Sequence, residues 1–156
     1  MGFYRFKNLK TNNNVIINID NSITVSFLPH LNRVVFNMAH PIQTTDRETG
    51  KVITIADYKY VDFTNNEEYE LEVTKIENLL YAAGFLVSSN QKHHLVNPTK
   101  IDYITFQKEK LKIIFDFNFS TSRSDTMQLS NECVVWSYRS EKEYTDNLIQ
   151  IEKDLL

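Results

Sequence analysis

An amphipathic segment that occurs twice is the feature that most constrains the fold of this chain of 156 residues. The first copy, EYELEVTKIENLL, covers residues 68–80, and the second, EYTDNLIQIEKDL, covers residues 143–155. When Tyr69 is placed on Tyr144, the apolar positions of both copies coincide, and they recur at i, i+4, i+7 and i+11 as one stripe along an α-helix. We refer to this as the helix alignment. We expect these two stripes to lie in the core: Tyr69, Val73, Ile76 and Leu80, and Tyr144, Leu148, Ile151 and Leu155.

Apolar runs before the two helical segments also match, when Ile16 is placed on Leu95. We refer to this second offset as the strand alignment. A loop four residues shorter in the second copy accounts for the difference between the two alignments, and surface loops tolerate such changes. Chance could explain any single run, but four runs in the same order with two consistent offsets favour an internal duplication. The matched runs are 16–18 with 95–97, 25–27 with 104–106, and 34–37 with 113–116.

The strand and turn signals predict the order β-β-β-β-α, twice, in an α+β fold. We expect a single domain, 1–156, made of two pseudo-repeats of about 1–84 and 85–156. It would hold two four-stranded antiparallel sheets backed by two helices that pack together. Residues 1–14 are expected to be a polar or basic lead-in. The expected strands are 15–19, 23–28, 33–39 and 52–63, then 93–97, 101–107, 110–119 and 132–139, with 41–51 as a hairpin loop.

Capping residues set the ends of the two expected helices, 67–83 and 141 to the C-terminus. Asn65 and Asn66 can cap the first helix, and Gly84 is placed to end it. Ser140 with Glu143 three residues later forms a capping box at the start of the second.

Acidic residues are concentrated in the two helical segments, although the whole chain carries a net charge of -3. Residues 62–80 and 141–156 hold eleven Asp and Glu against three lysines, which is -8, so the remainder carries +5. Because charges are screened over about 8–10 Å at physiological salt, a basic face could attract phosphates while the acidic face lies on the other side. The single cysteine, Cys133, cannot form an internal disulfide, which favours a reducing, cytoplasmic setting. No apolar run approaches membrane-spanning length.

Strand parity predicts which strand residues face the core. Core positions are expected at 34, 36 and 38, at 111, 113, 115 and 117, and at Ile104 and Phe106 on a neighbouring strand. The opposite parity mixes basic, aromatic and β-branched groups, which suits single-stranded nucleic acid. We expect Arg33, Lys110, Lys112 and Arg139 to contact phosphates, and Tyr60 and Tyr103 to stack on bases.

Two interpretations stay open for parts of this surface. Lys108, Lys110 and Lys112 alternate along one side of an expected strand, as a phosphate track would, but lysines also protect exposed edge strands from aggregation. Tyr60 and Trp136 could be core residues, because the parity of the fourth strands is ambiguous.

Residues for catalysis or metal binding are not evident in the sequence. His93 and His94 are adjacent, so on a strand they point to opposite faces, and no third ligand stands at metal-binding spacing. Cys133 fits a buried small residue better than a nucleophile. The chain has no Gly-rich phosphate loop, nucleophile elbow or paired-carboxylate motif. We therefore expect a protein without cofactor or metal that is not an enzyme.

The tandem β-β-β-β-α order, over about Val15 to Leu156, resembles the Whirly-type single-stranded-DNA-binding proteins and related transcriptional-coactivator proteins, which build this arrangement from two chains. The Lys-Gly-Lys-Ala-Ala-Leu signature of plant Whirly second strands is replaced by SITVSF at 22–27 and DYITF at 102–106. The resemblance implies single-stranded DNA as the partner, in replication, recombination or transcription. It carries over no single residue.

A different class of function is also consistent with this composition. The many Asn and Lys residues favour an AT-rich source such as a phage. A small phage or mobile-element protein could bind and inhibit a host protein, with the acidic helices mimicking nucleic acid. The sequence does not decide between DNA and RNA as the partner. It also leaves open sequence specificity and whether the protein forms a homo-oligomer.

Overall fold

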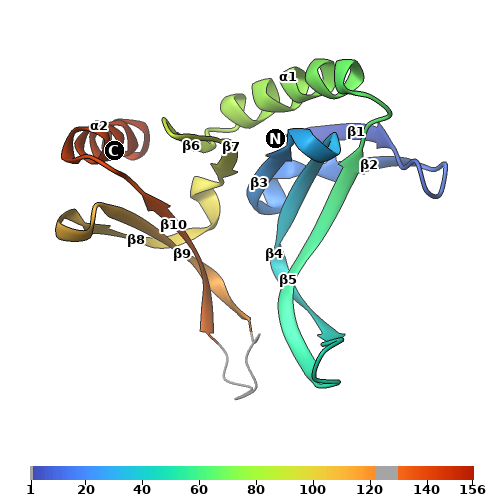
Figure 1. Cartoon of the computed structure of the whole chain (residues 1–156), viewed down its shortest axis with the longest axis horizontal. Helices are drawn as coiled ribbons and strands as arrows, with labels where there is room; N and C mark the ends of the chain where they lie inside the picture. The colour runs from blue at the N-terminus through green and yellow to red at the C-terminus, as the bar shows by residue number, and fades with distance from the viewer. Residues whose placement is uncertain (1, 122–129) are drawn as a thin grey trace.

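The structure is a computed structural model that describes residues 2–121 and 130–156 (Figure 1). These residues form an α+β fold with two α-helices and three antiparallel sheets. Neither helix in the described part is long and apolar enough to cross a membrane. The strands and helices are β1 Phe3–Lys7, β2 Asn14–Asn18, β3 Ser22–Leu28, β4 Arg33–Thr45, β5 Val52–Asp62, α1 Asn66–Ala82, β6 Leu86–Ser88, β7 Gln91–Val96, β8 Ile101–Gln107, β9 Lys112–Thr121, β10 Ser130–Ser137 and α2 Glu141–Leu155.

The strands pair differently from the two four-stranded sheets expected from the sequence. The strand orders are β5-β4-β3-β7-β6, β10-β9-β8 and β1-β2. The difference arises at β7, which pairs with β3 from the other half of the chain instead of with β8. This pairing brings Val25 opposite Leu95 and removes both from solvent. Burial of these apolar side chains therefore favours the pairing of β7 with β3.

Each helix packs on its own hydrophobic core. Tyr69, Ile76 and Leu80 of α1 belong to a first core with β1 to β4. Tyr144 and Ile151 of α2 belong to a second core with β9 and β10. The expected packing of the helices on each other is therefore not what the structure has, and Figure 1 shows them over different parts of the molecule.

Six of the eight residues in the predicted apolar stripes are buried. Val73 is buried with the rest of the first stripe, and Leu148 is partly buried against the second core. Leu155 was expected in the core but is exposed, because it is the last residue of α2 and lies beyond the turn that packs on the sheet.

The N-terminal segment is a strand and not a polar lead-in. In β1, Tyr4 and Phe6 are buried in the first core, and β1 pairs along its whole length with β2. The Tyr4 hydroxyl donates a 2.6 Å hydrogen bond to Glu72 Oε2 on α1, which ties the hairpin to the helix. Burial and this carboxylate raise the pKa of Tyr4 well above its usual value.

The predicted N-caps Asn65 and Ser140 are confirmed, but only the Ser140 half of the predicted capping box is present among the described hydrogen bonds. Asn65 Oδ1 accepts a 2.8 Å hydrogen bond from the backbone N–H of Glu68, and Ser140 Oγ accepts one of 3.2 Å from that of Glu143. Gly84 has φ +84°, the left-handed conformation that commonly ends a helix at glycine.

Strand parity is confirmed for most core positions. Val34, Phe36 and Met38 are buried, as are their counterparts at 113, 115 and 117. Leu111 precedes β9, has φ +52° and is only partly buried. Phe106 was expected to face the core but is 38% exposed, because β8 is an edge strand. β4 also extends to Thr45, into the segment 41–51 that was expected to be a hairpin loop.

The two halves have the same local geometry at positions that the strand and helix alignments pair. Before β4 and β9, Asn32 and Leu111 both adopt the left-handed conformation, at φ 49° and 52°. The β3/β4 register shift between residues 22 and 24 has a counterpart in β8/β9 between 101 and 103. Edge-to-face aromatic contacts also correspond: Phe63 with Tyr69, and Tyr138 with Tyr144.

Candidate functional site

Two tyrosines lie side by side on the sheet face opposite α1. Tyr58 and Tyr60 project from the same side of β5, with ring centroids 6.4 Å apart and planes 23° apart. Tyr60 pairs with Val35, whose parity is opposite to that of the core residues Val34 and Phe36. Tyr58 is exposed and Tyr60 half-buried, so Tyr58 offers the more accessible ring.

Cations lie over the Tyr60 ring. The guanidinium carbon of Arg33 is 4.3 Å from the ring centroid, and Lys10 Nζ is 5.5 Å from it. Arg33 also forms a two-point ion pair with Asp62, at 2.6 Å from Nε to Oδ1 and 3.1 Å from Nη2 to Oδ2. This pairing fixes Arg33 on the ring and neutralises much of its charge, which leaves Lys10 as the freer cation of the pair.

The other predicted contact residues lie on or beside the second sheet. Lys112 opens β9, where it pairs with Gln107 and Ser137, and the strand alignment places it at the position that Arg33 has in β4. Tyr103 on β8 is exposed. Arg139 is exposed but lies in the link between β10 and α2, off the sheet.

The predicted lysine track is wrong at two of its three positions. Residues 108–110 form a 3-10 turn, so Lys108 and Lys110 do not alternate along a strand with Lys112. Lys108 instead lies 3.5 Å from Glu141 Oε1 at the start of α2. Four of the six predicted contact residues therefore lie on the sheets in two groups: Arg33 with Tyr60 on the first, and Tyr103 with Lys112 on the second. Lys110 and Arg139 lie off the sheets.

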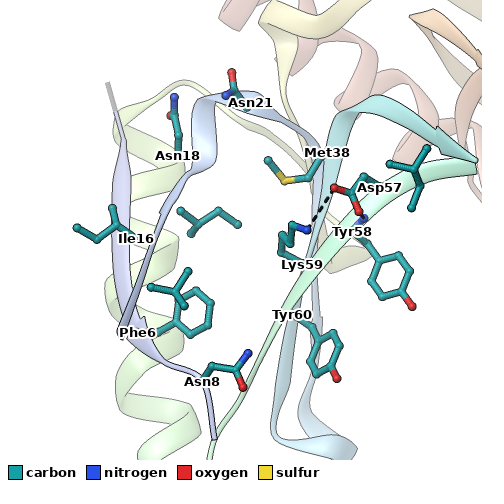
Figure 2. Close-up of a pocket in the computed structure, with 13 residues that line it drawn as sticks. Phe6, Asn8, Ile16, Asn18, Asn21, Met38, Asp57, Tyr58, Lys59 and Tyr60 are labelled. Atoms are coloured by element: carbon teal, nitrogen blue, oxygen red, sulfur yellow. Dashed lines mark hydrogen bonds and ion pairs between the residues drawn. The ribbon is translucent and has the colours of Figure 1, made fainter. Parts of the chain in front are cut away.

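An open groove of about 680 Å³ runs between the β1–β2 hairpin and the edge strand β5. Figure 2 shows apolar side chains such as Phe6 and Ile16 on the hairpin side and Met38 at one end, while the rings of Tyr58 and Tyr60 point away from the hairpin. Tyr58 and Tyr60 also line the groove, so the groove and the outer face of the sheet meet along β5.

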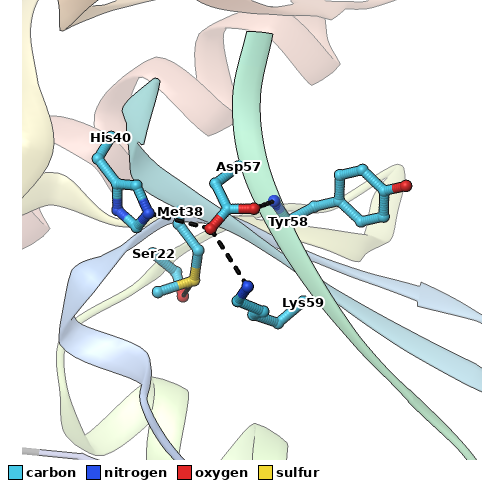
Figure 3. A network of polar contacts seen from close by, with 6 residues as sticks. All are labelled: Ser22, Met38, His40, Asp57, Tyr58 and Lys59. Atoms are coloured by element: carbon cyan, nitrogen blue, oxygen red, sulfur yellow. Dashed lines mark hydrogen bonds and ion pairs between the residues drawn. The ribbon is translucent and has the colours of Figure 1, made fainter. Parts of the chain in front are cut away.

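A charged network lies at the Met38 end of the groove (Figure 3). Asp57 Oδ2 is 3.0 Å from His40 Nε2 and 3.3 Å from Lys59 Nζ, and Asp57 Oδ1 accepts a 2.9 Å hydrogen bond from the Tyr58 backbone N–H. Partial burial acts to raise the pKa of Asp57, but these donors outweigh it and hold the pKa below its usual value. The network joins β4 to β5 where the β4–β5 register shifts.

The remaining candidate residues do not form a site. His93 is exposed, whereas the His94 Nε2 atom is buried with no hydrogen-bond partner among the described residues, and burial lowers the pKa of that ring. No group of three or more His, Cys, Asp or Glu is placed to hold a metal ion in the described part of the chain. Cys133 is exposed, contrary to expectation, and Trp136 is fully buried core.

Two residues of the surface around Tyr60, namely Tyr58 and Lys10, were not predicted from the sequence. Tyr58 could have been found, because it is two residues from Tyr60 and so shares its face of a strand. Lys10 could not, because it lies in the β1–β2 turn, and only the tertiary structure brings that turn to β5.

The fold and this surface define the chain as an α+β protein with an aromatic and basic sheet face. Comparison with protein-family models, curated proteins and solved structures found no match. The case for a function therefore depends on the residues themselves.

Proposed function

We propose that this protein binds single-stranded nucleic acid on the outer face of its first sheet. The observation that carries the proposal is the stacked Tyr58–Tyr60 pair with Lys10 and Arg33 over Tyr60. Bases stack on such rings whatever their sequence, and nearby cations bind the phosphates between them. DNA is the expected form, from the resemblance to Whirly-type proteins.

The placement of charge supports this surface as the binding face. The acidic residues Glu67, Glu68 and Glu70 are exposed on α1, which packs on the opposite face of the sheet from Tyr60. A strand lying along the tyrosines would thus be separated from these carboxylates by the sheet and the core. Asp62 lies on the binding face but is paired with Arg33, and the carboxylates on α1 oppose binding only weakly at physiological salt.

The second sheet would extend the same surface. We infer that the chain is a tandem duplication in which Lys112 corresponds to Arg33. The matching conformations at Asn32 and Leu111 and the matching register shifts support this inference. Tyr103 supplies the exposed ring on that sheet, so each half would offer one aromatic and one basic contact region.

A fluorescence anisotropy titration tests the proposal. Labelled oligo-dT, a matched duplex and oligo-rU are titrated at two salt concentrations with the wild type and with Tyr58→Ala and Lys10→Ala variants. Loss of a stacking ring should weaken single-strand binding by about 1–3 kcal/mol. Loss of a phosphate contact should make the logarithmic salt slope shallower by about 0.7.

Matched controls come from the helices. Tyr81 on α1 is about as exposed as Tyr58, and Lys142 on α2 is exposed, so Tyr81→Ala and Lys142→Ala should leave binding unchanged. Absence of single-strand binding at low salt would contradict the proposal and favour a host protein as the partner. Equal losses in the Tyr58 and Tyr81 variants would contradict the assigned face.

A further inference from the structure

Among the described strands, one pairing joins the two halves of the chain. β7, from the second half, pairs antiparallel with β3 of the first half, with Thr24 opposite Val96 and Val25 opposite Leu95. The Asn97 backbone N–H continues the ladder with a 2.8 Å hydrogen bond to the Ile23 carbonyl. In this way the β6–β7 hairpin of one half covers the edge strand of the other.

The counterparts of these two strands are both free edges in the described part of the chain. The strand alignment relates β3 to β8 and β7 to β2. β8 ends the three-stranded sheet, and β2 has β1 on one side and none of the described strands on the other. The Ile19 N–H donates to the Gly2 carbonyl, on the side of β2 that faces β1. Backbone N–H groups of an antiparallel strand alternate between its two sides, so those of Ile16 and Asn18 point to the side of β2 that has no partner among the described strands.

Exposure differs sharply between the covered pairing and its uncovered counterpart. At two positions of the β3–β7 pairing, and at Phe27 next to it on β3, the residue is almost fully buried while the one at the corresponding position of β2 or β8 is exposed. The pairs are Leu95 at 0% and Ile16 at 64%, Thr24 at 3% and Tyr103 at 51%, and Phe27 at 2% and Phe106 at 38%. Ile17, the counterpart of the buried Val96, is buried too.

The open groove beside β2 has a filled counterpart in the second half. Met38 lies at the groove, and the strand alignment relates it to Phe117. Phe117 is 1% exposed, because it belongs to a core that includes Ile23 and Ala56 of the first half. Met38 is itself buried, at 7% exposed, but the groove beside it is open, so among the described residues the first half has no neighbour on that side.

We propose that a second copy of this chain is that neighbour, and that β2 of one copy pairs antiparallel with β8 of the next. The β3–β7 register then places Ile17 opposite Tyr103, Ile16 opposite Ile104 and Val15 opposite Thr105 of the next copy. β2 and β8 lie at opposite ends of the molecule in Figure 1, so one chain cannot make this contact with itself.

Asn18 is already arranged for this contact. Its counterpart Asn97 is buried, and Asn97 Nδ2 donates to the carbonyls of Asp20 and Ser22 across the joint between the halves. Asn18 Oδ1 accepts from the Asp20 backbone N–H, as Asn97 Oδ1 does from that of Thr99. Within the described chain no acceptor is seen for Asn18 Nδ2, and the next copy would supply one beside β8.

The assembly is head to tail, because the two surfaces that meet are different. Such an interface closes into a ring or continues as a filament, according to the rotation between copies. The proposal rests on the tandem duplication and is independent of nucleic-acid binding, so it is tested on nuclease-treated protein without oligonucleotide.

Light scattering after size exclusion tests the assembly over a range of protein concentrations. The wild type should form species larger than a dimer, and Ile16→Glu or Phe106→Glu should give monomers. A mixture of these two variants should form a dimer and nothing larger, because each retains the surface that the other has lost. Leu71→Glu, at a residue of similar exposure on α1, should assemble like the wild type.

A cysteine pair tests the register without disturbing either edge. In a Cys133→Ser background, Val15→Cys with Thr105→Cys should form intermolecular disulfides on oxidation, because residues directly opposite have the required spacing. In the control pair, Val15→Cys with Gln107→Cys, the second cysteine lies two residues from the position opposite Val15. This pair should form about tenfold less intermolecular disulfide, or even less. A wild type that is monomeric at every concentration, or equal cross-linking of both pairs, would overturn the proposal.

Discussion

Asp57 shows how one partly buried carboxylate holds the bend of the β4–β5 hairpin. Its lowered pKa means that the folded protein favours the carboxylate form. The stability that this preference contributes is present above the ordinary pKa of 3.8 and is lost as the pH falls through the lowered folded value.

We therefore expect Asp57→Asn to be less stable than the wild type at pH 7, by roughly 1 kcal/mol for two lost charge-assisted hydrogen bonds. Its stability should also fall less steeply than that of the wild type below about pH 4. Urea unfolding at a series of pH values measures both effects. Glu109→Gln, at an exposed residue, is the control and should follow the wild-type profile.

Burial of the isoleucines in the two helices agrees with the predicted apolar stripes. Ile76 and Ile151 are buried in the two cores, whereas Ile149 on α2 is exposed. Truncation to Ala should cost about 2–5 kcal/mol at Ile76 and at Ile151, and well under 1 kcal/mol at Ile149. Denaturant unfolding of the three variants checks this. Similar costs at Ile149 and Ile151 would contradict the orientation of α2.

At the scale of elements, both helices begin at a side-chain cap. Asn65→Ala and Ser140→Ala should each cost about 0.5–2 kcal/mol, because each leaves a helix N–H without its partner. Asn66→Ala is the matched control: Asn66 is the first helical residue and exposed, and the change should be close to neutral. Thermal and urea unfolding compare the three, and a destabilised Asn66 variant would mean that the cap lies at Asn66.

The elements differ in how far the sequence could predict them. The helices were predicted to within one residue at each start, because apolar spacing and caps are local signals. β1 and β6 were missed. β1 has apolar residues at only alternate positions of a basic segment, and β6 has only three residues. The sequence pattern of each is therefore hard to distinguish from that of a loop.

At the scale of the molecule, Asn97 holds the two halves together. Its amide nitrogen bonds carbonyls of the first half while its oxygen bonds the Thr99 N–H and hydroxyl. Asn97→Ala leaves buried carbonyls without a donor and should cost about 1–3 kcal/mol or more. Urea unfolding at low protein concentration, where copies are apart, should show a smaller cost for Asn18→Ala. Equal costs would contradict the different environments of these two residues.

The candidate site could be predicted only in part. The face of Tyr60 and Arg33 follows from strand parity, and the structure adds that Arg33 is committed to Asp62 and that Tyr58 and Lys10 join the cluster. Tyr58 is two residues from Tyr60 and was open to prediction. The contacts of Arg33 with Asp62 and of Lys10 with Tyr60 join residues far apart in sequence, so local patterns do not contain them.

The amino-acid sequence by itself determined the helices, their caps and the inward faces of most strands, because period, capping and parity are properties of short segments. Only the tertiary structure decided that β7 leaves its own half for β3, that β1 and β2 stand apart as a hairpin, and that β8 ends a sheet. Backbone hydrogen bonds are alike for every strand edge. Which edges meet is therefore decided by the side chains that become buried together, such as Val25 with Leu95, and that choice exists only once distant segments are packed.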